Sequence, residues 1–273
     1  MTPRNNSSPM RRVALILALM LLPLVVSGQH HAGCIPTMKE HPFKGGEKIN
    51  FSMTYKWGAV NAEVASGLVT LDSLVYNGQP AYHMNFKVKS AAFFDVFFKM
   101  REDFHSWFTA KDLRPLKFTR DTYEGGYTAK NTYIYDWPAK VIHADVDFSS
   151  RGQRNLDIPL QACTYDLPSL IFYLRSMDIS RIKPGSKYNL SFAIDDEVYD
   201  IRLTYHGPEQ LKVRRKGKMD AHLFTCSVVS GALFEGNQEL KFWFSADGKY
   251  VPLGVMAPLR VGAVWVWLKD YQP

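Results

Sequence analysis

Apolar and polar residues alternate with a period of two through most of the chain after residue 46. In residues 48–55, for example, Ile49, Phe51 and Met53 fall on one face and polar residues fall on the other. This pattern is typical of β-strands, whose successive side chains point to opposite faces of a sheet. The segments with this pattern are 48–55, 60–71, 81–89, 103–109, 116–123, 127–136, 140–148, 188–194, 198–205, 209–213, 224–230, 239–245, 250–256 and 261–270.

Turn and helix signals interrupt the alternation. Asn77-Gly78 predicts a tight hairpin turn, because both residues accept the positive φ angles that such a turn requires. Residues 91–100 predict a short helix that is apolar on nearly all sides. Residues 166–177 predict a second helix, in which Asp166 is the N-cap and a proline occupies the first turn.

Many short strands with two short helices predict an all-β fold, mainly antiparallel, built as an open barrel or a sandwich. Residues 46–273 form this β domain. They make either one unit or two lobes, 46–160 and 184–273, joined by the helix near 166–177. Residues 29–45 are a polar lead-in.

The first 28 residues predict an export signal. Arg11 and Arg12 precede an uncharged apolar run at 13–26, which is shorter than the roughly 20 residues that span a bilayer. Small residues precede Gln29, where we expect the mature chain to begin. The periplasm is the favoured location. An outer-membrane lipoprotein, anchored at Cys34, and a secreted protein are the less favoured alternatives.

The net charge is modest once the signal is removed. The whole chain has 33 Lys and Arg against 26 Asp and Glu, and the three arginines of residues 1–28 leave 30 against 26, or +4. Such an excess allows weak peripheral contact with anionic membrane surfaces. A nucleic-acid partner is not expected for an exported protein. The sequence leaves the oligomeric state open.

Motifs for catalysis, cofactors and metals are missing from the sequence. Asp195-Asp196-Glu197 resembles a carboxylate site, but its position between two strands favours a solvated hairpin loop. Three cysteines remain after cleavage and allow at most one internal bridge. The sequence alone leaves open whether any two of them pair or remain small buried residues. We expect no catalytic residue, no metal site, no cofactor and no enzymatic activity.

Aromatic residues make up 14% of the chain and gather in a few places. Four phenylalanines crowd the helix at 91–100, and the last predicted strand is apolar on both faces. Three interpretations remain open: a large core with an aromatic plug, a cavity for a lipid or other apolar ligand, and an exposed interaction patch. The candidate ligand-binding residues are Trp57, Phe94, Phe97, Phe98, Trp107, Trp265 and Trp267.

An ordered series of short motifs resembles the DUF3108 family of exported bacterial proteins, in its Bacteroidetes form. The motifs are Gly46-Glu47-Lys48-Ile49, Phe97-Phe98-Lys99-Met100-Arg101-Glu102-Asp103, Cys163-Thr-Tyr165-Asp166-Leu-Pro-Ser169, Trp243-Phe-Ser-Ala-Asp247 and Val261-Gly262. The resemblance extends from about residue 44 to the C-terminus. It departs from the family at Arg101-Glu102-Asp103, where the family's usual Arg-Asp pair is interrupted.

The resemblance implies a β-rich, barrel-like envelope protein of unknown function, loosely similar to half-barrels that bind lipid or lipoprotein chains. It also implies a disulfide between Cys163 and Cys226, with Cys34 free. No catalytic residue carries over from the family.

Three functions therefore remain. The first is a non-catalytic envelope protein that binds a lipid or other apolar ligand in a half-barrel. The second is a structural or interaction module without a cavity. The third is an envelope hydrolase, for which Asp95 and Asp166 are the best acidic candidates.

Overall fold

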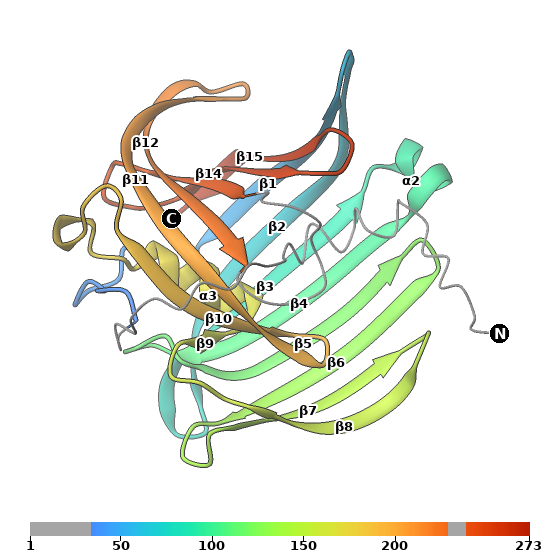
Figure 1. The fold of residues 1–273 in the computed structure, drawn as a ribbon, viewed down its shortest axis with the longest axis vertical. Coiled ribbons are helices and arrows are strands. Elements are labelled where there is room, and N and C mark those ends of the chain that lie inside the picture. Colours follow the sequence, from blue (N-terminus) through green and yellow to red (C-terminus); the bar gives the residue numbers. More distant parts are fainter. Residues whose placement is uncertain (1–33, 229–238) are drawn as a thin grey trace.

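A computed structural model describes residues 34–228 and 239–273, and one sheet of 15 strands dominates it (Figure 1). The predicted export signal, residues 1–28, lies outside the described residues. The elements in chain order are β1 (Lys48–Trp57), β2 (Val60–Tyr76), β3 (Gln79–Ser90), α2 (Ala92–Phe98), β4 (Met100–Thr109), β5 (Pro115–Glu124), β6 (Tyr127–Asp136), β7 (Val141–Phe148), β8 (Gly152–Pro159), β9 (Thr164–Tyr165), α3 (Leu167–Arg175), η1 (Ile179–Arg181), β10 (Lys187–Ile194), β11 (Glu197–Val213), β12 (Gly217–Val228), β13 (Leu240–Ser245), β14 (Pro252–Pro258) and β15 (Ala263–Gln272).

The strands follow the order β8-β7-β6-β5-β4-β3-β2-β1-β15-β14-β13-β12-β11-β10-β9. All neighbours are antiparallel except β9 and β10. The first and last strands of the chain are therefore neighbours in the middle of the sheet, and β8 and β9 are its two edges. The sheet curls without closing, as the ribbon shows (Figure 1). This confirms the predicted all-β, mainly antiparallel fold with two short helices, and of the two predicted architectures it is the open barrel.

The two halves predicted as alternative lobes are the two halves of this one sheet. Strands β1–β8 form one half and β9–β15 the other, joined by the ladder between β1 and β15. One buried cluster extends through both, from Phe104 and Phe118 in the first half to Leu190 and Phe224 in the second. The halves therefore share a core.

Local signals in the sequence explain most elements. Asn77 and Gly78 take φ angles of 49° and 81°, so the predicted hairpin turn between β2 and β3 is confirmed. Residues 198–205 and 209–213, predicted as two strands, are one 17-residue strand, β11, interrupted by an irregularity between Tyr205 and Gly207. Strand β8 was not predicted, because most of its residues are polar and exposed.

Helix α3 fills the inside of the curled sheet and contacts β3, β4 and β10. It begins as predicted: the Asp166 side chain accepts a hydrogen bond from the Ser169 backbone at 2.8 Å, completing a capping box. Phe172 is fully buried, and its ring lies 4.8 Å from that of Phe43 and 5.8 Å from that of Phe108. Among the described residues, no helix is long and apolar enough to cross a bilayer.

A buried ion pair fixes the end of α3 to the middle of the sheet. Arg175 and Glu47 are 0% and 2% exposed, and Arg175 Nη2 donates to Glu47 Oε1 at 2.9 Å. The Tyr271 hydroxyl, on β15, donates to the same carboxylate at 2.7 Å, and Arg175 Nε donates to the Tyr250 carbonyl at 3.1 Å. Burying two charges is unfavourable unless their hydrogen bonds are made, and here they are made.

The disulfide joins Cys34 to Cys163, with their Cα atoms 5.7 Å apart, and Cys226 is free. The implied Cys163–Cys226 pair, with Cys34 free, is therefore wrong. Cys226 lies on β12, and β10 and β11 separate it from β9, which follows Cys163. Strands β12 and β9 are therefore three strand spacings, or about 14 Å, apart, which is about twice the Cα–Cα distance that a disulfide can bridge. The lead-in brings Cys34 close, because the Tyr173 hydroxyl holds the Ile35 carbonyl at 3.0 Å.

Replacing Arg175 with methionine should destabilise the protein by about 3–5 kcal/mol, because Glu47 would remain buried without its partner. Urea unfolding followed by circular dichroism measures the change. Arg181→Met, the same substitution at an exposed arginine of η1, should change stability by less than about 0.5 kcal/mol. Equal effects of the two substitutions would contradict the role of the buried pair.

Peptide mapping without reduction should recover Cys34 linked to Cys163, with Cys226 alkylated once the protein is denatured. The Cys163→Ser variant should lose about 2–5 kcal/mol of stability, since the bond closes a long loop. A linked Cys163–Cys226 peptide would show that the lead-in is not attached in this way.

Candidate functional site

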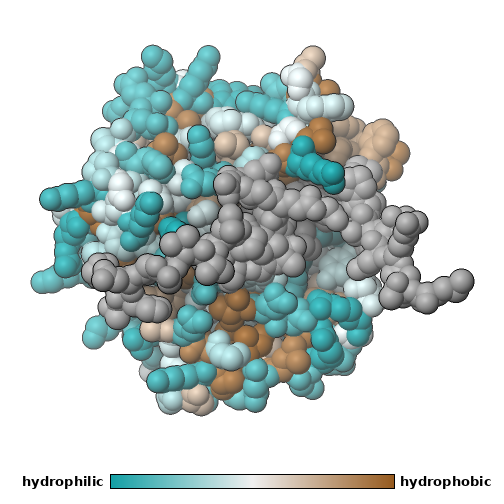
Figure 2. Space-filling model, viewed as in Figure 1, coloured by the Kyte–Doolittle hydropathy of each residue, from teal (hydrophilic) through white to brown (hydrophobic). Residues whose placement is uncertain are grey.

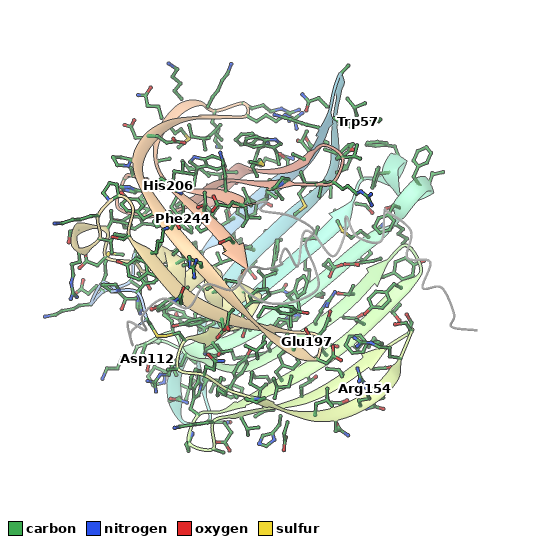
Figure 3. The ribbon with its side chains drawn as sticks, in the orientation of Figure 1. Trp57, Asp112, Arg154, Glu197, His206 and Phe244 are labelled. Carbon is green, nitrogen blue, oxygen red and sulfur yellow. A yellow bond between two sulfur atoms is a disulfide. The ribbon has the colours of Figure 1, made fainter. Side chains whose placement is uncertain are left out.

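Six large apolar side chains are exposed at one end of the sheet, and we call them the apolar rim. They lie on the β1–β2 turn, on α2 and on the β14–β15 turn. Val96 and Phe97 are the most exposed, at 82% and 71%. Figure 2 shows hydrophobic atoms over α2, and Figure 3 labels Trp57 at the tip of the β1–β2 hairpin. The rim consists of Trp57, Val60, Phe93, Val96, Phe97 and Val261.

Close backbone packing brings these three elements together. Gly262 has a φ of 76°, and a Cβ there would lie 2.3 Å from the Lys56 carbonyl oxygen, so only glycine fits. This contact sets the β14–β15 turn against the β1–β2 turn. The Ala91 amide, just before α2, donates to the Val64 carbonyl of β2 at 2.8 Å. The rim is therefore a defined surface rather than scattered side chains.

Helix α2 is anchored along one side and exposed along the other. Phe98 packs with Met53, Val88 and Met100 in a small buried cluster. Asp95 accepts hydrogen bonds from Arg101 and Ser90, and these contacts lower its pKa to about 2. These contacts leave the other face of a seven-residue helix, with Phe93, Val96 and Phe97, in solvent.

The charge around the rim is mainly positive. Lys89, Lys99 and Arg260 are exposed beside it. The acidic groups there have arginine partners: Asp95 pairs with Arg101, and Glu63 with Arg214. The surface thus combines aromatic and aliphatic side chains with cations.

A second group of side chains lies on the inner, concave face of the sheet below the rim, and we call it the concave cluster. It comprises Glu102, Arg120, Glu124, Asn131 and Asp195, from β4, β5, β6 and the turn between β10 and β11. Thr122 links two of them: Arg120 Nε donates to its hydroxyl at 2.6 Å, and that hydroxyl donates to Glu102. Arg120 also donates to Asp195.

Burial perturbs the two glutamates of the cluster. It raises the pKa of Glu102 well above its ordinary value; the Arg120 charge opposes this rise and the Glu124 charge adds to it. Burial also raises the pKa of Glu124. Burial therefore disfavours the charged form of both neighbouring carboxyls.

The β10–β11 turn was predicted to be a solvated loop, and this was wrong. Asp195 and Asp196 have side chains only 14% and 18% exposed. Asp196 accepts two hydrogen bonds from Arg151, at 2.8 and 3.1 Å, and one from Arg154 at 2.7 Å. The turn reaches the opposite edge of the sheet, as Figure 3 shows with Glu197 beside the turn and Arg154 on β8.

Comparison with protein-family models matches residues 50–266 to "Protein of unknown function (DUF3108)". The chain belongs to the DUF3108 family. A solved structure, the β-barrel-like protein of domain of unknown function DUF1849 from Brucella abortus, has a similar fold. The TM-score is 0.54 with 11% identity, covering 88% of this chain and 99% of the other. No curated protein matches the chain.

The predicted ligand-binding residues of this DUF3108 protein do not form one pocket. Trp57 and Phe97 belong to the apolar rim, Phe94 is half-buried and Phe98 is buried beneath α2. Trp107 lies elsewhere, on β4, with its ring stacked 4.5 Å from that of His83.

Trp265 and Trp267 of the DUF3108 chain stack on each other at 4.9 Å, with the Lys56 ammonium 4.7 Å from the Trp265 ring. Two surface hollows stand out among the described residues. One, of about 910 Å³, lies beside the β2–β3, β4–β5 and β6–β7 turns, and the other, of about 480 Å³, lies over β6–β8. None of the predicted ligand-binding residues lines either hollow.

The acidic candidates for a hydrolase have separate roles in this family member. Asp95 pairs with Arg101 at the rim, whereas Asp166 is fully buried as the N-cap of α3 and accepts a hydrogen bond from Ser106 at 2.8 Å. Burial raises the pKa of Asp166 to about 7, although its hydrogen bonds oppose this. Within the described ranges, no three His, Cys, Asp or Glu side chains converge to hold a metal ion.

The raised pKa of Asp166 predicts that stability falls as pH rises from about 4 to 7. In this window the folded protein keeps a proton that the unfolded chain has released, so raising the pH favours unfolding. The loss attributable to Asp166 is at most about 4 kcal/mol. Glu102 and Glu124 act in the same direction.

The Asp166→Asn variant keeps an N-cap and should show a shallower pH dependence of urea unfolding than the parent. Asp178→Asn, at the cap of η1, serves as the control and should keep the parental slope. Parental pH dependence in Asp166→Asn would contradict the assignment.

Proposed function

We propose that this DUF3108 protein is an exported, non-catalytic envelope protein that contacts a lipid surface through its apolar rim. The observation that carries the proposal is the outward face of α2. There Phe93, Val96 and Phe97 lie in solvent beside Trp57. Exposed aromatic and aliphatic side chains that gather on adjacent turns are typical of an interaction surface.

The chemistry of the rim favours lipid over a protein partner. Tryptophan and phenylalanine insert at the boundary between headgroups and acyl chains, and basic residues beside them attract anionic headgroups. Lys89, Lys99 and Arg260 supply that charge, while the nearby acids are paired with arginines. A membrane-facing surface of this kind needs no enclosed cavity.

An apolar ligand inside the half-barrel has less support as a function. Helix α3 and the rings of Phe43, Phe108 and Phe172 fill the described interior where such a ligand would lie. The two hollows described above are at the surface. The proposal therefore assigns lipid contact to the rim, with the barrel as its rigid support.

The disulfide supports export, because such bonds persist in oxidising compartments. It also weighs against anchoring at Cys34, since a sulfur atom in a disulfide cannot carry a lipid thioether. The non-catalytic part of the proposal rests on Asp95 and Asp166, which pair with or cap parts of the fold instead of facing each other across a cleft.

Replacing Val96 and Phe97 with serine should weaken binding to vesicles by at least about a hundredfold, because each side chain contributes about 1.5–3 kcal/mol when fully buried. Flotation with vesicles containing phosphatidylglycerol measures the binding, and vesicles of phosphatidylcholine test the role of charge. The double variant should keep the parental melting temperature, since both residues are exposed.

Val75→Ser is the matched control, because Val75 is 70% exposed at the far end of β2 from the rim. It should bind vesicles like the parent. If the parent does not bind vesicles, or if the rim variant binds as well as the control, the proposal fails.

A further inference from the structure

Side chains, not strand pairing, connect the β8 edge of the curled sheet to the turn between β10 and β11. That turn forms no ladder with β8, yet Asp196 accepts hydrogen bonds from Arg151, just before β8, and from Arg154 on β8. Deeper in the concavity, Asp195 binds Arg120 of β5 and Asn131 of β6. Two aspartates of one turn are thus surrounded by three arginines from the opposite half.

An aromatic ring lies beside the guanidinium group of each of the three arginines. The guanidinium of Arg151 lies 4.3 Å from the centre of the Phe148 ring, and that of Arg154 lies 6.0 Å from the same ring. The Arg120 guanidinium lies 5.8 Å from the Phe104 ring. Aromatic faces fix the plane of a guanidinium and leave its N–H edges available for an anion.

The arginines have donors that the aspartates do not use. Arg120 Nη2 and Arg154 Nε are buried and make no hydrogen bond among the described residues, although Glu124 Oε1 lies 3.9 Å from Arg120 Nη2. Arg120 is 0% exposed, so this donor is also shielded from water. A phosphate group presents more acceptor oxygens than a carboxylate and binds guanidinium groups through paired hydrogen bonds.

The charges also favour an anion once the turn is withdrawn. Arg120, Arg151 and Arg154 carry three positive charges. Burial disfavours the charged forms of Glu102 and Glu124, so the site without the turn has a surplus of positive charge. Asp195 and Asp196 neutralise that surplus. Asp195 does so at a φ of 55°, an unfavourable backbone conformation for a residue other than glycine.

We propose that Arg120, Arg151 and Arg154 form a binding site for a phosphate group, and that the turn with Asp195 and Asp196 is an internal mimic that occupies it. A phosphate ligand competes with the two carboxylates and releases the turn from β8. Arg151 and Arg154 are 46% and 39% exposed, so an incoming anion meets them first. The phosphate belongs either to a lipid headgroup or to free phosphate.

Calorimetric titration with inorganic phosphate, at constant ionic strength set by chloride, tests the site. The Asp196→Asn variant should bind phosphate at least about tenfold more tightly than the parent, because a competing carboxylate has been removed. Adding Arg151→Gln and Arg154→Gln to that variant should abolish binding. Asp157→Asn, an exposed aspartate on β8 paired with His143, should keep the parental affinity.

A titration with dihexanoyl phosphatidic acid, as dispersed monomers, distinguishes the two sources. Tighter binding of this compound than of inorganic phosphate would assign the site to a lipid headgroup, and equal or weaker binding to free phosphate. Both titrations use monomeric ligands in solution. Loss of vesicle binding at the apolar rim would therefore leave this result unchanged.

If Asp196→Asn is less stable than the parent, melting temperatures in phosphate and in chloride provide a second test of phosphate binding. Phosphate should then raise the melting temperature of Asp196→Asn more than chloride does, and this gain should vanish when Arg151 and Arg154 are replaced. Hydrogen exchange of the parent should show faster exchange at residues 194–197 with phosphate than with chloride. No gain in affinity and no phosphate-specific stabilisation in Asp196→Asn would overturn the proposal and leave the turn as a structural contact.

Discussion

The buried pair of Arg175 and Glu47 is the interaction on which the rest of the structure depends. It ties the last turn of α3 to the start of β1, and the Tyr271 hydroxyl extends it to β15. Those two strands form the only ladder that joins the halves of the described sheet. A charged pair so deeply buried is stable only with its hydrogen bonds complete, and it therefore fixes the helix and both strands in one arrangement.

Because α3 is fixed inside the curled sheet, the parts of the molecule available for contact are at its margins. One margin is the end where the turns and α2 expose apolar side chains. The other is the open side, where arginines of the β8 edge meet aspartates of the β10–β11 turn. The protein thus separates an apolar surface from a charged one, and a rigid sheet lies between them. A molecule with both an acyl chain and a charged headgroup offers the same two chemistries.

The sequence predicted the elements that depend on local patterns. Alternation identified most strands, and Asp166 identified the start of α3, because a cap acts within one turn of helix. Strand β8 was not predicted, because its residues are mostly polar and its outer edge is unpaired. The pairing of Cys34 with Cys163 was not predicted, because it depends on how the lead-in lies against α3. The two cysteines are 129 residues apart in the sequence.

The residues of the concave cluster could be predicted only in part, because the cluster joins the two halves of the sheet. Glu102 and Arg120 follow the same alternation as their apolar neighbours Phe104 and Phe118, so their inward direction could be read from the sequence. Their partner Asp195 could not, because it comes from the other half of the sheet. The exposed face of α2 was one of three interpretations that the sequence left open, because a cluster of phenylalanines does not by itself indicate whether they face the core, a cavity or solvent.

The adjacency of the first and last strands has a consequence for how the protein is made. Strand β1 cannot find its neighbour β15 until the whole chain is available, so the seam of the sheet cannot form during synthesis. Long-range pairing of this kind folds slowly. A chain whose seam has not yet formed is in the open state that a secretion channel requires, which agrees with the export proposed above.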